Sequence, residues 1–201
     1  NQMEPLWGTE IFPEYYSRFE KAARETEGVT LTWEGHFIDP LFTHTTTGFT
    51  RPGDEEHPYL ASVSCVHDPE EEGFVQEMIM QPEEAAKRVS AIPAGDGSFR
   101  TIPPEAFPEQ VQIISRDEAG YALQLQIGGF PFNGEEVRLA LGLPSACFEL
   151  NRHGSDVRFT VRGRGHGWGL SQTEAQALAE DGWSAEAILE YFYTGISFSS
   201  E

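Results

Sequence analysis

The chain has 201 residues, and its 33 acidic against 13 basic side chains give a formal net charge of −20. A surface with that charge repels phosphate backbones and anionic lipid head groups, which argues against nucleic acid as a partner. The length suits one domain, or one domain with a small lobe, and is sufficient for a buried core.

The N-terminal part predicts a helix followed by a hairpin. Residues 14–27 place apolar side chains on one helical face, and Gly28 follows as a stop signal. Residues 29–34 and 37–43 lie on either side of Gly35 and alternate as the strands of a β-hairpin do.

The next stretch predicts a loop and a strand followed by a helix. Residues 51–58 are polar and contain two prolines, which predicts a loop that projects from the sheet. Residues 74–80 predict a strand, and a helix should start near Pro82 because proline is tolerated at the first helical position. Residues 91–108 are rich in proline and glycine and are the best candidate for a sub-boundary or an excursion.

The second half adds more short strands and helices. The strand-like segments are 111–115, 121–127, 147–150 and 156–161. The helical segments are 134–141, 172–180 and 184–193. Because the strands and helices do not alternate regularly, the sequence predicts an α+β fold with a mixed or antiparallel sheet, several short helices and two helices at the C-terminus.

Residues 163–172, with the sequence GRGHGWGLSQ, contain alternate glycines around His166. Glycine permits positive φ and the close approach of a ligand to the backbone, so the run predicts a loop with exposed N–H groups. Ser171 stands at an N-cap position with Glu174 three residues later, as in a capping box. The loop therefore should present His166, Ser171 and Gln172 at the start of a helix, with Gly165 and Gly167 giving backbone access.

Each polar side chain of this loop has two interpretations. His166 contacts a ligand, or it locks the loop by bonding its own backbone. Ser171 partly matches a G-x-S-x-G nucleophile motif, but Thr173 replaces the last glycine, which favours helix capping. Gln172 offers a donor and an acceptor to a sugar, or is a helix surface residue. Trp168 stacks on a sugar face, or covers the back of the loop.

A second polar group follows the predicted strand that ends near residue 43. His44, Thr45, Thr46 and Thr47 suit the wall of a cleft, and a threonine-rich strand edge is the alternative.

The two cysteines, Cys65 and Cys147, encode neither a disulfide framework nor a paired CxxC metal site, although a bridge between them is compatible with an exported protein. A zinc set could be assembled from His44, Cys65, His67 and His166, but no HExxH motif supports it, so we expect no metal. Most acids, including 54–56 and 68–72, should form a solvated face.

The glycine loop and the segments around it resemble one known family. The loop GRGHGWGLSQ, the alanine-rich segment behind it and the ending ILEYFYTG at 188–195 resemble the C-terminal signature of the SpoIID/LytB family of sporulation proteins and amidase enhancers. Further matches in the same order are Trp7-Gly8, 25–29, 35–39, 42–48, 58–60, 62–63, Gly134, Arg138, Leu141, Leu143 and Phe148. The resemblance covers nearly all of residues 1–201, which we therefore interpret as one domain of this type.

The resemblance implies a murein lytic transglycosylase domain that acts outside the cytoplasmic membrane, in the cell wall or, for a true sporulation member, at the forespore-engulfing membrane. The substrate would be peptidoglycan glycan strands, cleaved between N-acetylmuramic acid and N-acetylglucosamine with a 1,6-anhydro product. No metal or organic cofactor is implied. Cell-wall hydrolases are possible partners, and a membrane would be reached only through an anchor that is not in residues 1–201.

The residue regarded as catalytic in that family is a glutamate well before the position matched by Trp7-Gly8, which places it upstream of Asn1. We therefore expect residues 1–201 to be N-terminally truncated and to hold no catalytic residue. The segment 77–88 superficially resembles the missing helix but lies after His44, and we interpret it as a strand and a helix.

A glycan-binding module or enhancer of a partner hydrolase is the main alternative function. A serine or metal hydrolase is the second.

Overall fold

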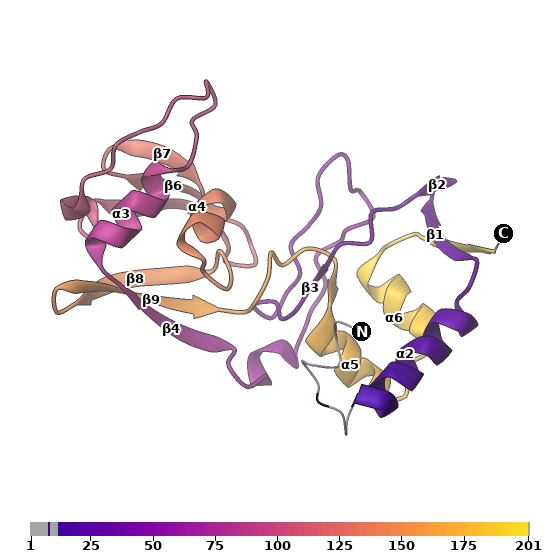
Figure 1. Ribbon diagram of the computed structural model, residues 1–201. Helices are drawn as coiled ribbons and strands as arrows, with labels where there is room; N and C mark the ends of the chain where they lie inside the picture. The colour runs from indigo at the N-terminus through magenta and orange to yellow at the C-terminus, as the bar shows by residue number, and fades with distance from the viewer. Residues whose placement is uncertain (1–7, 9–11, 201) are drawn as a thin grey trace. The chain divides into compact units, whose positions relative to one another are not determined.

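The computed structural model describes residue 8 and residues 12–200 (Figure 1). Two positions named in the sequence analysis lie outside the described residues. They are Trp7, which is part of the family resemblance, and Asn1, upstream of which we expect the glutamate of the family. The truncation and the position of that glutamate therefore stay predictions. The chain forms two compact units, one with the residues up to Ile38 and from Ile196 onward, the other with Asp39–Gly195.

The first unit contains the predicted helix and hairpin. Helix α2, Phe12–Glu25, is followed by strands β1, Val29–Trp33, and β2, His36–Phe37. Glu34 and Gly35 both have positive φ, 49° and 82°, which is the conformation of a tight hairpin turn. Strand β11, Ser197–Ser200, pairs antiparallel with the other edge of β1.

The larger unit contains two three-stranded antiparallel sheets. One has the order β4-β9-β8, with β4 at Val75–Met80, β8 at Phe148–His153 and β9 at Asp156–Arg162. The other has the order β5-β6-β7, with bounds Val111–Arg116, Ala122–Ile127 and Phe130–Asn133. These strands confirm the four predicted in the second half of the chain and the one predicted at 74–80, and β7 adds a strand that the sequence pattern does not predict.

Two short helices complete this part of the unit. Helix α3, Pro82–Ser90, starts at the proline as predicted, and α4, Gly134–Leu141, is capped by Asn133, whose side chain accepts the N–H groups of Glu135 and Glu136. Segment 91–108 lies within this unit and contains the short 3-10 helix η2, Pro104–Ala106.

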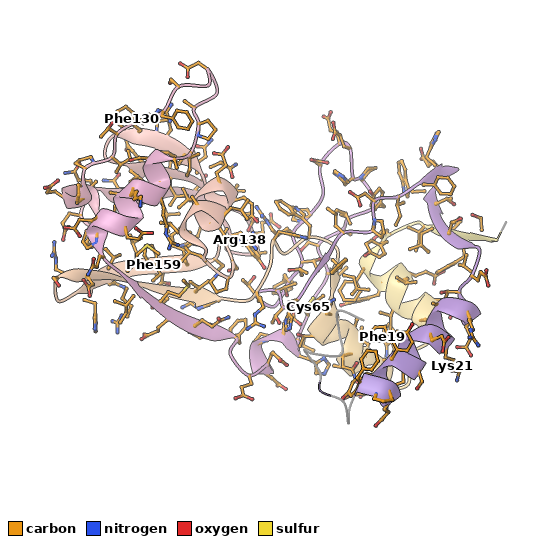
Figure 2. All side chains as sticks on the ribbon, viewed as in Figure 1. Phe19, Lys21, Cys65, Phe130, Arg138 and Phe159 are labelled. Carbon is orange, nitrogen blue, oxygen red and sulfur yellow. The ribbon has the colours of Figure 1, made fainter. Side chains whose placement is uncertain are left out.

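The main core lies between these sheets and helices. Every second residue of β9 is buried, namely Val157, Phe159 and Val161. Phe159, labelled in Figure 2, packs edge-on against Phe148 with ring centroids 6.1 Å apart. This period of two is the reason that the sequence pattern predicts the strand.

The C-terminal part of the larger unit holds the glycine loop. Strand β3, Phe42–Thr43, pairs parallel with β10, Leu170–Ser171, and helices α5, Gln172–Glu180, and α6, Ala185–Phe192, follow. The two C-terminal helices are confirmed. The single strand predicted at 37–43 is wrong, because the chain leaves the hairpin after β2 and joins a different sheet at β3.

The α+β class is confirmed by these elements. No helix among residues 12–200 is long and apolar enough to span a membrane. Cys65 and Cys147 are both buried and are free thiols, and burial raises the pKa of Cys65 to about 12.

Candidate functional site

The glycine loop packs against the chain segment around β3. A side chain on Gly169, where φ is +71°, would overlap the carbonyl oxygen of Leu41, and one on Gly165, where φ is +110°, would overlap the Thr43 hydroxyl. Gly163, Gly167 and Gly169 are buried. The glycines therefore admit neighbouring backbone and side-chain atoms of the same chain, whereas the sequence predicts that they expose the loop to a ligand.

His166 makes the backbone contact that one interpretation predicts. Its Nδ1 accepts the N–H of Trp168 at 3.0 Å, and its own carbonyl accepts Nη1 of Arg51 at 3.2 Å. Burial lowers the pKa of His166, the positive charges of Arg138 and Arg51 act in the same direction, and a hydrogen bond with the Phe42 backbone opposes them. The imidazole is therefore neutral near pH 7 and stabilises the loop. A direct contact to a ligand stays a prediction.

Arg51 organises the side of the loop that carries Trp168. It is 4% exposed, its Nε donates to Oδ2 of Asp117 at 2.5 Å, and its backbone N–H donates to the Gly167 carbonyl at 2.8 Å. The guanidinium lies 3.7 Å from the centroid of the Trp168 ring and 4.8 Å from that of Tyr121. Arg51 is thus a buried element of the site, and the prediction that it belongs to a projecting loop is wrong.

A buried carboxylate joins the other end of the loop to the β3 segment. Asp68 is fully buried and accepts the Ser171 hydroxyl at 2.8 Å and the Thr46 N–H at 2.5 Å. Burial raises the pKa of Asp68, and the hydrogen bonds from Thr46 and Ser171 oppose that shift. Asp68 therefore does not belong to the solvated acidic face that the sequence predicts for residues 68–72.

The capping prediction for Ser171 is confirmed in one direction. Its hydroxyl accepts the N–H of Glu174 at the start of α5. The Glu174 carboxylate does not return a bond to Ser171 as a full capping box would. It accepts the N–H of His67 at 2.8 Å and pairs with Nδ1 of His67 at 3.1 Å. The capping residues and their neighbours thus connect α5 to the segment around Asp68.

His44 and Gln172 line one pocket of about 230 Å³, together with Glu71, Thr173 and Gln176. His44 is half-buried, its Nδ1 lies 2.6 Å from the Thr45 hydroxyl, and its carbonyl accepts the Thr173 N–H at 3.1 Å. These bonds hold two predicted site residues, from the end of β3 and the start of α5, on one polar surface.

Sequence comparison adds an independent observation. No family model matches the chain. Two curated proteins, stage II sporulation protein D from Bacillus amyloliquefaciens and from Bacillus subtilis (strain 168), are each 28% identical to it, over 99% and 98% of its length. The chain is a distant homologue of the SpoIID family. It spans about half the length of these curated relatives, 56% and 55%.

The SpoIID-like domain brings together only some of the predicted site residues. His44 and Gln172 share the polar pocket, whereas Trp168 lines a different pocket with Leu41 and Leu60. The predicted residues that are buried are Thr45, Thr46, Gly167 and Ser171, and Gly165 is half-buried. These five hold the backbone of the loop, so a role in ligand binding would be indirect and stays a prediction.

Sequence reasoning missed Arg51, Asp117, Asp68 and Glu174 as members of this site. Each makes its contacts with a distant segment of the chain. Arg51, Asp117 and Asp68 belong to no recognisable spacing motif, and the capping-box motif of Glu174 does not predict its bond to His67. Among the residues that the structure describes, no group of three or more His, Cys, Asp or Glu side chains could hold a metal ion.

Proposed function

We propose that this SpoIID-like domain binds peptidoglycan glycan strands and contributes the glycan cleft of a lytic transglycosylase. Homology over nearly the whole chain to stage II sporulation protein D supports this proposal. The observation that carries the site assignment is the polar pocket in which His44 and Gln172 meet. The sequence alone singles out both residues, and they come from segments that are far apart in the chain.

The pocket suits a sugar because it presents donors and acceptors together. The amide of Gln172 offers both, and so does that of Gln176, which keeps one Nε2 hydrogen beside its bond to Glu180. The Glu71 carboxylate accepts, while the Thr173 hydroxyl donates to the His44 carbonyl and has no hydrogen left for a sugar. Gln172 and Glu71 are exposed, so sugar hydroxyls can reach them.

In the proposed reaction a glutamic acid from outside residues 1–201 protonates the glycosidic oxygen. The C6 hydroxyl of the muramoyl unit attacks the anomeric carbon as the glycosidic bond breaks, and the next sugar leaves as an alcohol with the transferred proton. The C6 hydroxyl loses its own proton to the same carboxylate, and the 1,6-anhydro ring is closed. One carboxyl can serve first as acid and then as base, so a carboxylate pair is not obligatory. The described residues would hold and orient the glycan strand.

A non-catalytic glycan-binding module or enhancer is the second candidate, and the state of the buried acids favours it. Asp68 and Glu174 are 0% and 2% exposed and are occupied by hydrogen bonds, so neither can reach a glycosidic oxygen. If residues 1–201 release anhydromuramoyl products, the exposed Glu71 in the pocket is the carboxylate to replace, and Glu71→Gln should then abolish release.

The test is retention of the chain on insoluble peptidoglycan. Losing one hydrogen bond to a ligand costs about 0.5–1.5 kcal/mol, so His44→Ala and Gln172→Ala should each weaken retention roughly 2- to 13-fold. Gln112→Ala, which removes an exposed glutamine on β5, is the matched control and should bind as the parent does. Equal retention of all four proteins would remove the pocket from the proposal.

A further inference from the structure

The segment after Arg51 forms a closed loop that holds His57 in one orientation. The Gly53 N–H donates to the Leu60 carbonyl at 2.7 Å and the Leu60 N–H donates to the His57 carbonyl at 3.0 Å. Oδ1 of Asp54 accepts the backbone N–H groups of Glu56 and His57, each at 3.0 Å, and lies 2.8 Å from Nδ1 of His57. A side chain on Gly53 would overlap the His57 carbonyl, so the close approach of these two backbones requires glycine.

This contact decides which nitrogen of His57 faces a ligand. An ionised carboxylate can only accept, so Nδ1 carries the proton and Nε2 of the neutral ring is an acceptor. The hydrogen bond from His57 lowers the pKa of Asp54, which keeps that carboxylate ionised. Within residues 12–200 the structure gives Nε2 no hydrogen-bond partner. The side chain of His57 is 26% exposed, and Nε2 is not one of the fully buried, unpartnered polar atoms of the described residues, so solvent reaches it.

His57 faces the same small pocket as Trp168. The pocket has a volume of about 170 Å³ and is lined by Leu41, Gly53, Asp54, His57, Leu60 and Trp168. Sites for drug-sized ligands run from about 300 to 1,000 Å³, so this pocket admits one ring and not an extended ligand.

Trp168 is fixed in the wall of that pocket. Its Nε1 donates to the Pro52 carbonyl at 3.1 Å, and the Arg51 guanidinium packs on its ring at 3.7 Å. A side chain held in this way loses little conformational entropy when a ligand binds. An apolar wall with the acceptors of His57 and Asp54 at its rim matches a pyranose, which has an apolar C–H face and hydroxyl donors at its edge.

We propose that the Trp168 and His57 pocket is a subsite for a single sugar ring of the glycan strand, with the ring against Trp168 and a sugar hydroxyl donating to Nε2 of His57. This subsite rests on the proposed glycan-binding function. It is distinct from the pocket of His44 and Gln172, with which it shares no lining residue.

The experiment follows the Trp168 resonance by fluorine NMR in the whole chain labelled with 5-fluorotryptophan, while purified soluble glycan strands are added. Trp168→Phe assigns the resonance among the four tryptophans. We expect the resonance to shift with glycan concentration. The apparent Kd should rise about 2- to 13-fold in His57→Ala, the effect of one lost hydrogen bond.

His57→Phe keeps the ring and its edge contact with Tyr59 but removes both nitrogens, so it should weaken binding as His57→Ala does. His153→Ala, which removes an exposed histidine of β8, is the matched control and should leave the Kd unchanged. A folded His57→Phe protein with the parent Kd would overturn the role of His57. If glycan is retained on the chain while the Trp168 resonance stays unmoved, the subsite is wrong and the proposed function stands. If the parent chain retains no glycan, both fall.

Discussion

Arg51 shows how one buried residue can set the geometry of the glycine loop. Its side chain is 5% exposed and forms an ion pair with Asp117, whose side chain is 12% exposed. The Arg51 guanidinium also packs against the aromatic rings of Trp168 and Tyr121. The polar composition around Arg51 predicts a surface loop. Composition cannot show that Arg51 will be buried as an ion pair with Asp117, so the prediction fails at this residue.

Arg51→Ala should therefore destabilise the fold strongly. Removing one partner of a buried ion pair leaves the other charge unpaired and typically costs about 3–5 kcal/mol. We expect urea unfolding to show a decrease of that size in the free energy of unfolding. Arg152→Ala removes an arginine whose ion pair is 57% and 49% exposed, and it should change stability by less than about 1 kcal/mol. Equal effects of the two variants would contradict the burial of Arg51.

The pair of His67 and Glu174 predicts a pH dependence. The hydrogen bond that His67 donates to the Glu174 carboxylate raises the pKa of His67 above its ordinary 6.5. Because the folded pKa lies above the unfolded one, the contribution of the pair is complete below about pH 6.5 and is lost as the pH rises through the folded pKa. The stability difference between the parent and His67→Ala should therefore be largest below about pH 6.5 and shrink as the pH rises above it, measured by thermal melting. A difference that grows with pH would contradict this sign.

At the scale of elements, the packing of β3 against β10 depends on glycine. Gly169→Ala should cost more than the backbone strain alone, because the new methyl group would overlap the Leu41 carbonyl. Gly182→Ala is the matched control, since φ there is +89° but the space around the new methyl group is empty. In urea unfolding, we expect the control to lower the free energy of unfolding by about 1–3 kcal/mol. Gly169→Ala should lower it by roughly 1–3 kcal/mol more than the control does. Equal losses of stability in the two variants would mean that the segments around Leu41 and Gly169 can move apart at little cost, which would contradict the tight packing.

The elements that sequence predicts best are those with local signals. Helix α3 begins at Pro82, α5 begins after its Ser171 cap, and α4 and β9 match their expected bounds closely. Strands β3 and β10 have two residues each, which is too short to show a periodic pattern. They also lie more than a hundred residues apart in the sequence, so no local signal indicates that they pair. The same holds for the site. The glycine-loop motif identifies Gln172, and the polar run after a predicted strand identifies His44. Only the fold reveals that Asp68 and Arg51 hold their segments in place.

At the scale of the whole molecule, the sequence predicts the α+β class, which the helices and strands of the structure confirm. The sequence also resembles the SpoIID family, and the distant homology confirms that resemblance. Its length leaves one domain, or one domain with a small lobe, open, but the sequence does not predict a division in which the two ends of the chain together form the smaller unit. That division depends on β11 pairing with β1 in a register such as Leu31 opposite Phe198, a contact between segments near the two ends of the chain. Neither segment carries a local signal for the other.

Retention of the whole chain on glycan strands stripped of peptide tests the central claim most directly. Because the claim rests on hydrogen bonds to sugar and not on the net charge of −20, the chain should sediment with the glycan at low and at high salt alike, and soluble glycan strands should release it. A chain that stays in the supernatant at every salt concentration, or that sediments only when salt is low, would contradict the claim.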